Sequence, residues 1–242
     1  MMFEPPYVPA DRFEAQLRER GHAVLSPADV GRAFGIGAEE LAALTPFWND
    51  LPPDAYLKDG GRYRFRRHSC FVAEGQALAL SPQRAHWQPV DYNALHGGIE
   101  RWFEPMAAAA VAASAWSKLL LGLAGTASGL KGRQPWFIEA HQFRIDTTDG
   151  IGRPTPEGAH RDGVDLVAVF LIERRHIKGG ESRVFEACGP NGQRFTMNAP
   201  WTLLLLDDER MIHETTPIQP DGEHGHRDTL VVTLRANGFQ GP

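Results

Sequence analysis

The pattern of hydrophobic and polar positions changes about halfway along the chain. Residues 1–132 contain segments with helical spacing, whereas residues 133–242 contain short runs of β-branched and apolar residues separated by glycine, proline and aspartate. We therefore expect a helix-rich N-terminal region that supports a β-rich core, within one structural domain. The boundary is placed at residues 125–132, where glycine and small residues predict a loop.

The N-terminal region is predicted to contain several short helices. Gly21 is expected to end the first of them, because glycine readily adopts the left-handed conformation at a helix C-terminus. Ser26 and Pro27 are a cap residue and a first-turn proline for the second helix, which ends near Gly35. The predicted helices span residues 11–20, 27–35, 38–44 and most of 98–125, with a short strand at 22–25.

The second half of the chain is predicted to form an all-β core. Short apolar runs follow one another closely, and this density of strands is typical of a barrel or sandwich. The predicted strands span residues 137–146, 164–173, 182–186, 194–197, 201–207, 211–215 and 228–235.

One more strand is predicted in the N-terminal region, where arginines alternate with aromatic residues over Arg62–Phe71. We interpret it first as a solvent-exposed edge strand, because charged residues commonly protect sheet edges. The alternative is that one arginine reaches a substrate pocket, and the sequence leaves the roles of Arg62, Arg64 and Arg66 open.

Composition excludes several classes of function. The 242 residues have 42% hydrophobic and 23% charged residues, which is typical of a globular protein, and the net charge of −5 without a basic run argues against a nucleic-acid partner. The alanine-rich residues 106–125 contain Ser114, Ser117 and Lys118, so we expect a packed helix there rather than a membrane span. With no secretory signal and two distant cysteines, Cys70 and Cys188, a cytoplasmic location is expected. Oligomeric state is not predicted.

The first candidate for chemistry is His160 with Asp162. Two residues apart on an extended segment, their side chains point to the same side. A second histidine from a distant strand would complete two imidazoles and one carboxylate on a metal, the ligand set of non-haem Fe(II) oxygenases. His213, which follows the apolar strand at 201–207, is the candidate for that position.

Arg227 opens the last predicted strand, fourteen residues after His213. An oxygenase of this kind must hold 2-oxoglutarate, and a guanidinium binds the distal carboxylate of that molecule through two parallel hydrogen bonds. Thr229 falls on the same face of the strand and can add a hydroxyl donor.

In this order of motifs the sequence resembles the Fe(II)/2-oxoglutarate-dependent dioxygenases, which have a double-stranded β-helix (jelly-roll, cupin-like) core. The resemblance is closest to a bacterial subgroup that contains the free L-isoleucine hydroxylases and the biofilm-stress-motility proteins. The residues that carry it are His141–Arg144, Pro154–Gly163, Gly179–Ser182, Leu206–Asp208, His213 and Arg227–Leu230.

The resemblance implies Fe(II), 2-oxoglutarate and O2 as cofactors and co-substrates. It implies a double-stranded β-helix with the helical region packed on it, and hydroxylation or sulfoxidation of a small free L-amino acid with release of succinate and CO2. Such a substrate needs an anion for its ammonium and a cation for its carboxylate, for which we name Glu157 and Arg144.

Three other interpretations stay open. The same chemistry can act on a larger or peptidyl substrate, in which case an open groove should replace a closed pocket roofed by the N-terminal helices. A cupin-like metal isomerase or ligand-binding protein is the second, and a zinc hydrolase the third. His224 and His226 form a rival pair of histidines, but their glycine-containing surroundings favour a solvated hairpin loop.

Overall fold

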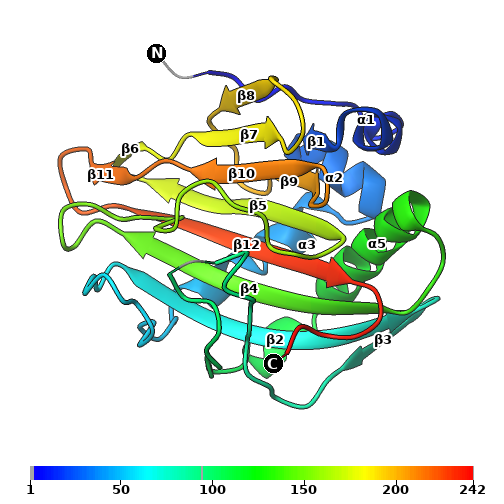
Figure 1. The fold of residues 1–242 in the computed structure, drawn as a ribbon, viewed down its shortest axis with the longest axis horizontal. Coiled ribbons are helices and arrows are strands. Elements are labelled where there is room, and N and C mark those ends of the chain that lie inside the picture. The colour runs from blue at the N-terminus through cyan, green and yellow to red at the C-terminus, as the bar shows by residue number, and fades with distance from the viewer. Residues whose placement is uncertain (1–2, 94, 242) are drawn as a thin grey trace.

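The computed structural model describes residues 3–93 and 95–241 and consists mainly of antiparallel sheets (Figure 1). A seven-stranded sheet has the order β1-β9-β5-β12-β4-β2-β3. A three-stranded sheet, β10-β7-β8, and a two-stranded sheet, β11-β6, complete the core. This is the predicted double-stranded β-helix. The strands of the large sheet are, in that order, His22–Leu25, Leu203–Asp207, Leu166–Arg175, His226–Arg235, Trp136–Asp146, Arg64–Glu74 and Ala77–Leu80; β10, β7, β8, β11 and β6 are Met211–Thr215, Ser182–Glu186, Gly192–Phe195, Ile218–Pro220 and Ile177–Gly179.

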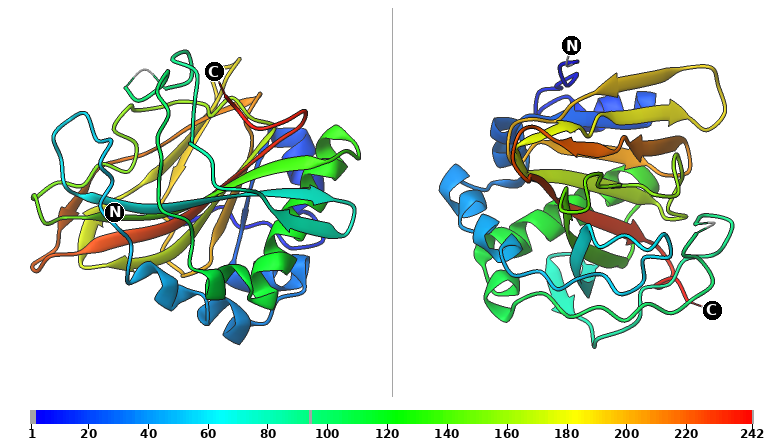
Figure 2. Two further views of the ribbon diagram at one scale, coloured as in Figure 1. Left: turned by 90° about the horizontal axis from the view of Figure 1, so that it is seen from below. Right: turned by 90° about the vertical axis from the view of Figure 1, so that its left-hand side faces the viewer.

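The helices gather on one side of the large sheet (Figure 2). Their apolar side chains form one core cluster with the strand residues that face them, such as Leu230 and Val232 of β12. Burial of this large apolar surface is the main force that holds the helical region on the sheet. The helices are α1 (Phe13–Arg20), α2 (Pro27–Phe34), α3 (Ala38–Ala42), α4 (Ala108–Val111) and α5 (Ser114–Lys131), with a 3-10 turn at Thr45–Trp48.

The opposite face of the large sheet lies over the small sheets. There Val167 and Val169 of β5 form a second core cluster with residues of β7, β9 and β10. Because strand side chains alternate, β12 presents Leu230 and Val232 to the helices and Val231 and Thr233 to the interior of the β-helix. The polar side chains considered below lie on the face that points to the interior of the β-helix.

The predicted ends of the first two helices are confirmed. Gly21 and Gly35 follow α1 and α2 with positive φ values of 75° and 64°, which glycine adopts without steric cost. Ser26 accepts a hydrogen bond from the Asp29 amide at the start of α2. No helix among residues 3–93 and 95–241 combines the length and the apolar character needed to cross a membrane.

Two predictions about the N-terminal region are wrong. The residues predicted as a loop, 125–132, are mostly the last turns of α5, because leucine and alanine side chains continue to bury one face of the helix. The strand predicted as a solvated edge, β2, lies between β3 and β4, and its Arg64 and Arg66 are buried. Three strands from residues 1–132 thus belong to the large sheet, and the proposed division at residue 132 stays a prediction.

Candidate functional site

His160, Asp162 and His213 converge at one end of the small sheet. His213 lies on β10, and its backbone exchanges two hydrogen bonds with that of His160, with N–O distances of 3.0 and 2.9 Å. This bridge places the two imidazole rings 4.6 Å apart between centroids. One ligand atom from each of the three residues lies within 4.8 Å of the others. The structure therefore brings together the three residues predicted as metal ligands.

One ring nitrogen of His160, Nδ1, is engaged in a hydrogen bond to the backbone. Its Nδ1 lies 2.9 Å from the Gly158 carbonyl oxygen, which fixes the hydrogen on Nδ1 and leaves the Nε2 lone pair for a metal. Burial lowers the pKa of His213 well below its ordinary value, so this imidazole is neutral, as metal binding requires. For His160, burial is outweighed by the neighbouring Asp162 and Glu157, which raise its pKa, so a metal would displace a proton there on binding. Two imidazole nitrogens and one carboxylate suit a divalent iron ion with open coordination positions.

Asp162 is oriented from two sides. Gln88 donates a hydrogen bond of 3.1 Å from its side-chain amide to Oδ1 of Asp162. The buried carboxylate of Asp208 accepts the backbone N–H groups of three successive residues, Asp162, Gly163 and Val164. Burial, and then the neighbouring Asp162, raise the pKa of Asp208 to about 7. Asp208 thus holds the backbone of this segment, and Gln88 orients the side chain.

A cavity of about 110 Å³ opens beside the three residues. Phe143 and Val231 of the large sheet contribute apolar side chains to its wall. Its roof is formed by irregular segments at residues 84–93 and 95–104, which contribute His86, Gln88 and Arg101. A roof of N-terminal helices is the feature that would favour a free amino acid over a larger substrate. Within the described residues these helices do not form it, because they pack on the other face of the large sheet, against its apolar residues.

Arginines give the cavity wall its positive charge. Arg64 donates a 2.7 Å hydrogen bond to the buried Asp54, and Arg66 lies between the rings of Phe103 and Phe143. Arg101 comes from the roof and donates to the side chain of Gln88. Each of the three guanidiniums retains one buried nitrogen without a hydrogen-bond partner among the described residues. Such unpaired donors indicate a site for a ligand with acceptor oxygens.

Glu157 carries negative charge into the same cavity. Its Oε1 lies 3.5 Å from Nε2 of His160, and its buried Oε2 has no hydrogen-bond partner within the described residues. Arg144 does not reach the cavity. Its guanidinium makes a bidentate pair with Asp228, at 2.8 and 2.6 Å, because even-numbered residues of this part of β4 face away from the interior.

Arg227 is buried at the start of β12, on the same face as Thr229. Burial lowers the pKa of Arg227 to about 10, and the neighbouring Arg174 contributes to that shift. One terminal nitrogen of Arg227 and one of Arg174 are buried without hydrogen-bond partners among the residues described. A buried guanidinium and a half-buried one, neither of them paired with a carboxylate among the described residues, fit the distal carboxylate of 2-oxoglutarate. Arg174, at the end of β5, had no signal in the sequence.

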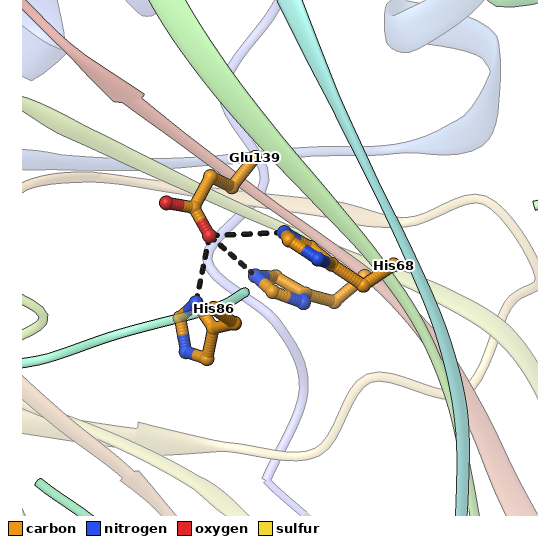
Figure 3. A group of neighbouring side chains, drawn as sticks. His68, His86 and Glu139 are labelled. Atoms are coloured by element: carbon orange, nitrogen blue, oxygen red, sulfur yellow. Dashed lines mark hydrogen bonds and ion pairs between the residues drawn. The ribbon is translucent and has the colours of Figure 1, made fainter. Parts of the chain in front are cut away.

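Sequence reasoning also missed a second cluster of metal-binding side-chain types in the cavity wall. It comprises His68, His86, Glu139 and His141, all of them buried, with one ligand atom from each within 4.8 Å of the others (Figure 3). The sequence separations are large and irregular, so spacing alone gave no indication of it.

Comparison with known proteins places these observations among oxygenases. A family model described as "2OG-Fe dioxygenase" matches residues 45–233. The structure of a bsmA homolog from Methylobium petroleophilum PM1 is 50% identical, with a TM-score of 0.94, and the match covers 99% of this chain and 98% of that one.

Two more distant structures share the fold. IDO from Bacillus thuringiensis is 16% identical, with a TM-score of 0.76 over 98% of this chain and 100% of that chain. The Fe(II)/(alpha)ketoglutarate-dependent dioxygenase TqaL is 18% identical, with a TM-score of 0.71 over 93% of this chain and 86% of that chain. Comparison with curated proteins gives no match.

Proposed function

The chain belongs to the 2OG-Fe dioxygenase family, and we propose that it hydroxylates or sulfoxidises a small free L-amino acid. The family uses Fe(II), 2-oxoglutarate and O2, so the enzyme is an oxidoreductase that consumes 2-oxoglutarate. The observation that supports a free amino acid is the cavity: it is small, and it carries charges of both signs beside the three candidate metal ligands.

We assign roles from the side chains that converge and from the buried atoms that lack partners among the described residues. His160, Asp162 and His213 would hold the iron, and Arg227 with Thr229 would bind the distal carboxylate of 2-oxoglutarate. Glu157 would accept hydrogen bonds from the substrate ammonium, because its Oε2 is buried and unpaired. Arg64 and Arg101 replace Arg144 as the candidates for the substrate carboxylate, because both line the cavity.

The bound iron and 2-oxoglutarate supply the oxidising power, and the protein supplies position and exclusion of water. Gln88 keeps the Asp162 carboxylate aimed at the metal position. The guanidiniums and Glu157 would fix both ends of the amino-acid backbone, so that one C–H bond of the side chain faces the iron. His86, Gln88 and Arg101 of the roof line the cavity beside them.

A peptidyl substrate is the alternative. It would have to leave the cavity in both directions along its chain, and its backbone amides have no charges to match with Glu157 and the arginines. The test is a screen of free L-amino acids and short capped peptides for stimulated succinate release, with mass detection of one added oxygen. Turnover of capped peptides without turnover of any free amino acid would refute the proposal.

A further inference from the structure

The function proposed above does not use the cluster of His68, His86, Glu139 and His141, of which the last three line the cavity. Glu139 and His141 are on β4 and His68 on β2, while His86 comes from the roof. Figure 3 shows His68 and His86 directed at one oxygen of Glu139. The Glu139 Oε2 lies 3.0 Å from Nε2 of His68 and 2.7 Å from Nδ1 of His86.

The hydrogen-bond pattern argues against a metal in this cluster. Arg66 lies 2.7 Å from Nδ1 of His141, and a guanidinium can only donate, so the hydrogen of a neutral His141 is on Nε2. A metal on that Nε2 would require an imidazolate.

The same pattern leaves two acceptor atoms available. His86 donates its Nδ1 hydrogen to Glu139, so its Nε2 carries a lone pair. Glu139 takes both imidazole hydrogen bonds on Oε2, and Oε1 has no hydrogen-bond partner among the described residues. Both residues line the cavity. The imidazoles hold the pKa of Glu139 far below its usual range despite burial, while burial lowers the pKa of His86 to about 4. At neutral pH the pair is therefore a carboxylate beside a neutral imidazole.

Neighbouring arginines do not occupy these acceptors. The Arg66 guanidinium lies between two aromatic rings and donates to His141, and Arg101 donates to Gln88. A buried carboxylate oxygen and an imidazole lone pair together match a group with several N–H donors and a positive charge. The α-ammonium is already assigned to Glu157, so this second acceptor pair is free for the side chain of the substrate.

We infer that Glu139 and His86 form a subsite for a cationic side chain, so that the substrate is a basic amino acid rather than an aliphatic one. This inference rests on the free amino-acid substrate proposed above. The selectivity would come from desolvation: an aliphatic side chain in the cavity would displace water from Oε1 of Glu139 without replacing its hydrogen bonds, whereas an ammonium or guanidinium would replace them.

The first test compares matched substrates on the wild-type enzyme with iron and 2-oxoglutarate present. L-Lysine and L-norleucine differ by one terminal ammonium, as do L-ornithine and L-norvaline. We expect kcat/KM to be at least roughly 100-fold higher for the basic member of each pair, from the cost of an unpaired buried charge. Preference for norleucine or norvaline overturns the inference and leaves the proposed function standing. Absence of turnover with every free amino acid overturns both.

The second test uses variants. Glu139→Gln should lower kcat/KM for the basic substrates by roughly 100-fold and change that for the neutral ones by less than about threefold. Glu173→Gln is the matched control, because Glu173 also bonds a histidine, His226, at 2.7 Å but does not line the cavity. An equal loss for both substrate classes overturns the inference. The inference is also overturned if the cluster binds a metal. In that case the His213→Ala variant would still bind one metal ion per chain, and the double variant His213→Ala, His141→Ala would bind none.

Discussion

Replacing Arg227 by alanine should weaken binding of 2-oxoglutarate with little effect on the iron. The structure gives the magnitude. Burial lowers the pKa of Arg227 from 12.5 to about 10, with Arg174 adding to the shift, and this difference corresponds to roughly 3 kcal/mol of destabilisation of the buried charge. A carboxylate that pairs with this guanidinium relieves that destabilisation on binding. We therefore expect the KM for 2-oxoglutarate to rise by about 100-fold, since each 1.4 kcal/mol is a factor of ten.

The assay is succinate release at varied 2-oxoglutarate and saturating iron and amino acid. Arg62→Ala is the matched control, because the Arg62 side chain is 84% exposed and pairs only with Asp149 at the surface. Iron affinity, from anaerobic titration, should stay within about threefold of wild type, because Arg227 does not line the cavity with the three candidate ligands. A KM for 2-oxoglutarate within about threefold of wild type in Arg227→Ala would refute the assignment of this buried cation to the co-substrate.

Three further changes test other parts of the structure. Gln88→Leu should weaken Fe(II) binding by roughly 10- to 100-fold in an anaerobic titration, because it removes the hydrogen bond that orients Asp162. Gln83→Leu is the control and should leave Fe(II) binding unchanged, because it removes only a hydrogen bond to the Phe103 carbonyl oxygen. Gly179→Ala should lower the free energy of unfolding, measured in urea, by at least about 2 kcal/mol, because the φ of Gly179 is 78° and a Cβ there would clash with the Pro217 carbonyl oxygen. Gly150→Ala is the control, since its φ is 90° but the space around it is open. An equal loss in Gly150→Ala would contradict the steric reason. The folded pKa of His86 is lowered from 6.5 to about 4, so its contribution to stability is present above pH 6.5 and is lost as the pH falls to about 4. The loss should be up to roughly 3 kcal/mol and should be absent in His86→Asn.

The parts of the site that sequence reasoning predicted are those set by local chain geometry. His160 and Asp162 share a side because alternation on an extended segment requires it, and Arg227 and Thr229 share a face for the same reason. Alternation also explains the error at Arg144. It lies one residue from Phe143, which lines the cavity, so its side chain points to the opposite face. The choice between these two faces depends on strand pairing, which a single sequence does not reveal.

The remaining parts depend on contacts between residues that are distant in the chain. Arg64 and Arg66 were interpreted as solvent-exposed because their counter-ion, Asp54, lies in an irregular segment that folds back on β2. Without that carboxylate, two arginines on one face of a strand would be expected in water. The pairing of Glu139 with His68 and His86 likewise requires three separate segments to meet.

The candidate iron ligands and the large-sheet residues proposed to contact substrate lie on different walls of the cavity. The candidate iron ligands His160 and His213 are joined by backbone hydrogen bonds at the edge of the small sheet, whereas Arg66, Glu139 and His141 lie on the large sheet. Gln88, from the roof, bonds both the candidate ligand Asp162 and Arg101, a candidate for binding the substrate carboxylate. Since each wall is held by its own sheet, substitutions on the large sheet should change which substrate is accepted while the iron site keeps its geometry. Because Gln88 contacts a candidate iron ligand and a candidate substrate-binding arginine, a change there should alter both iron binding and substrate binding.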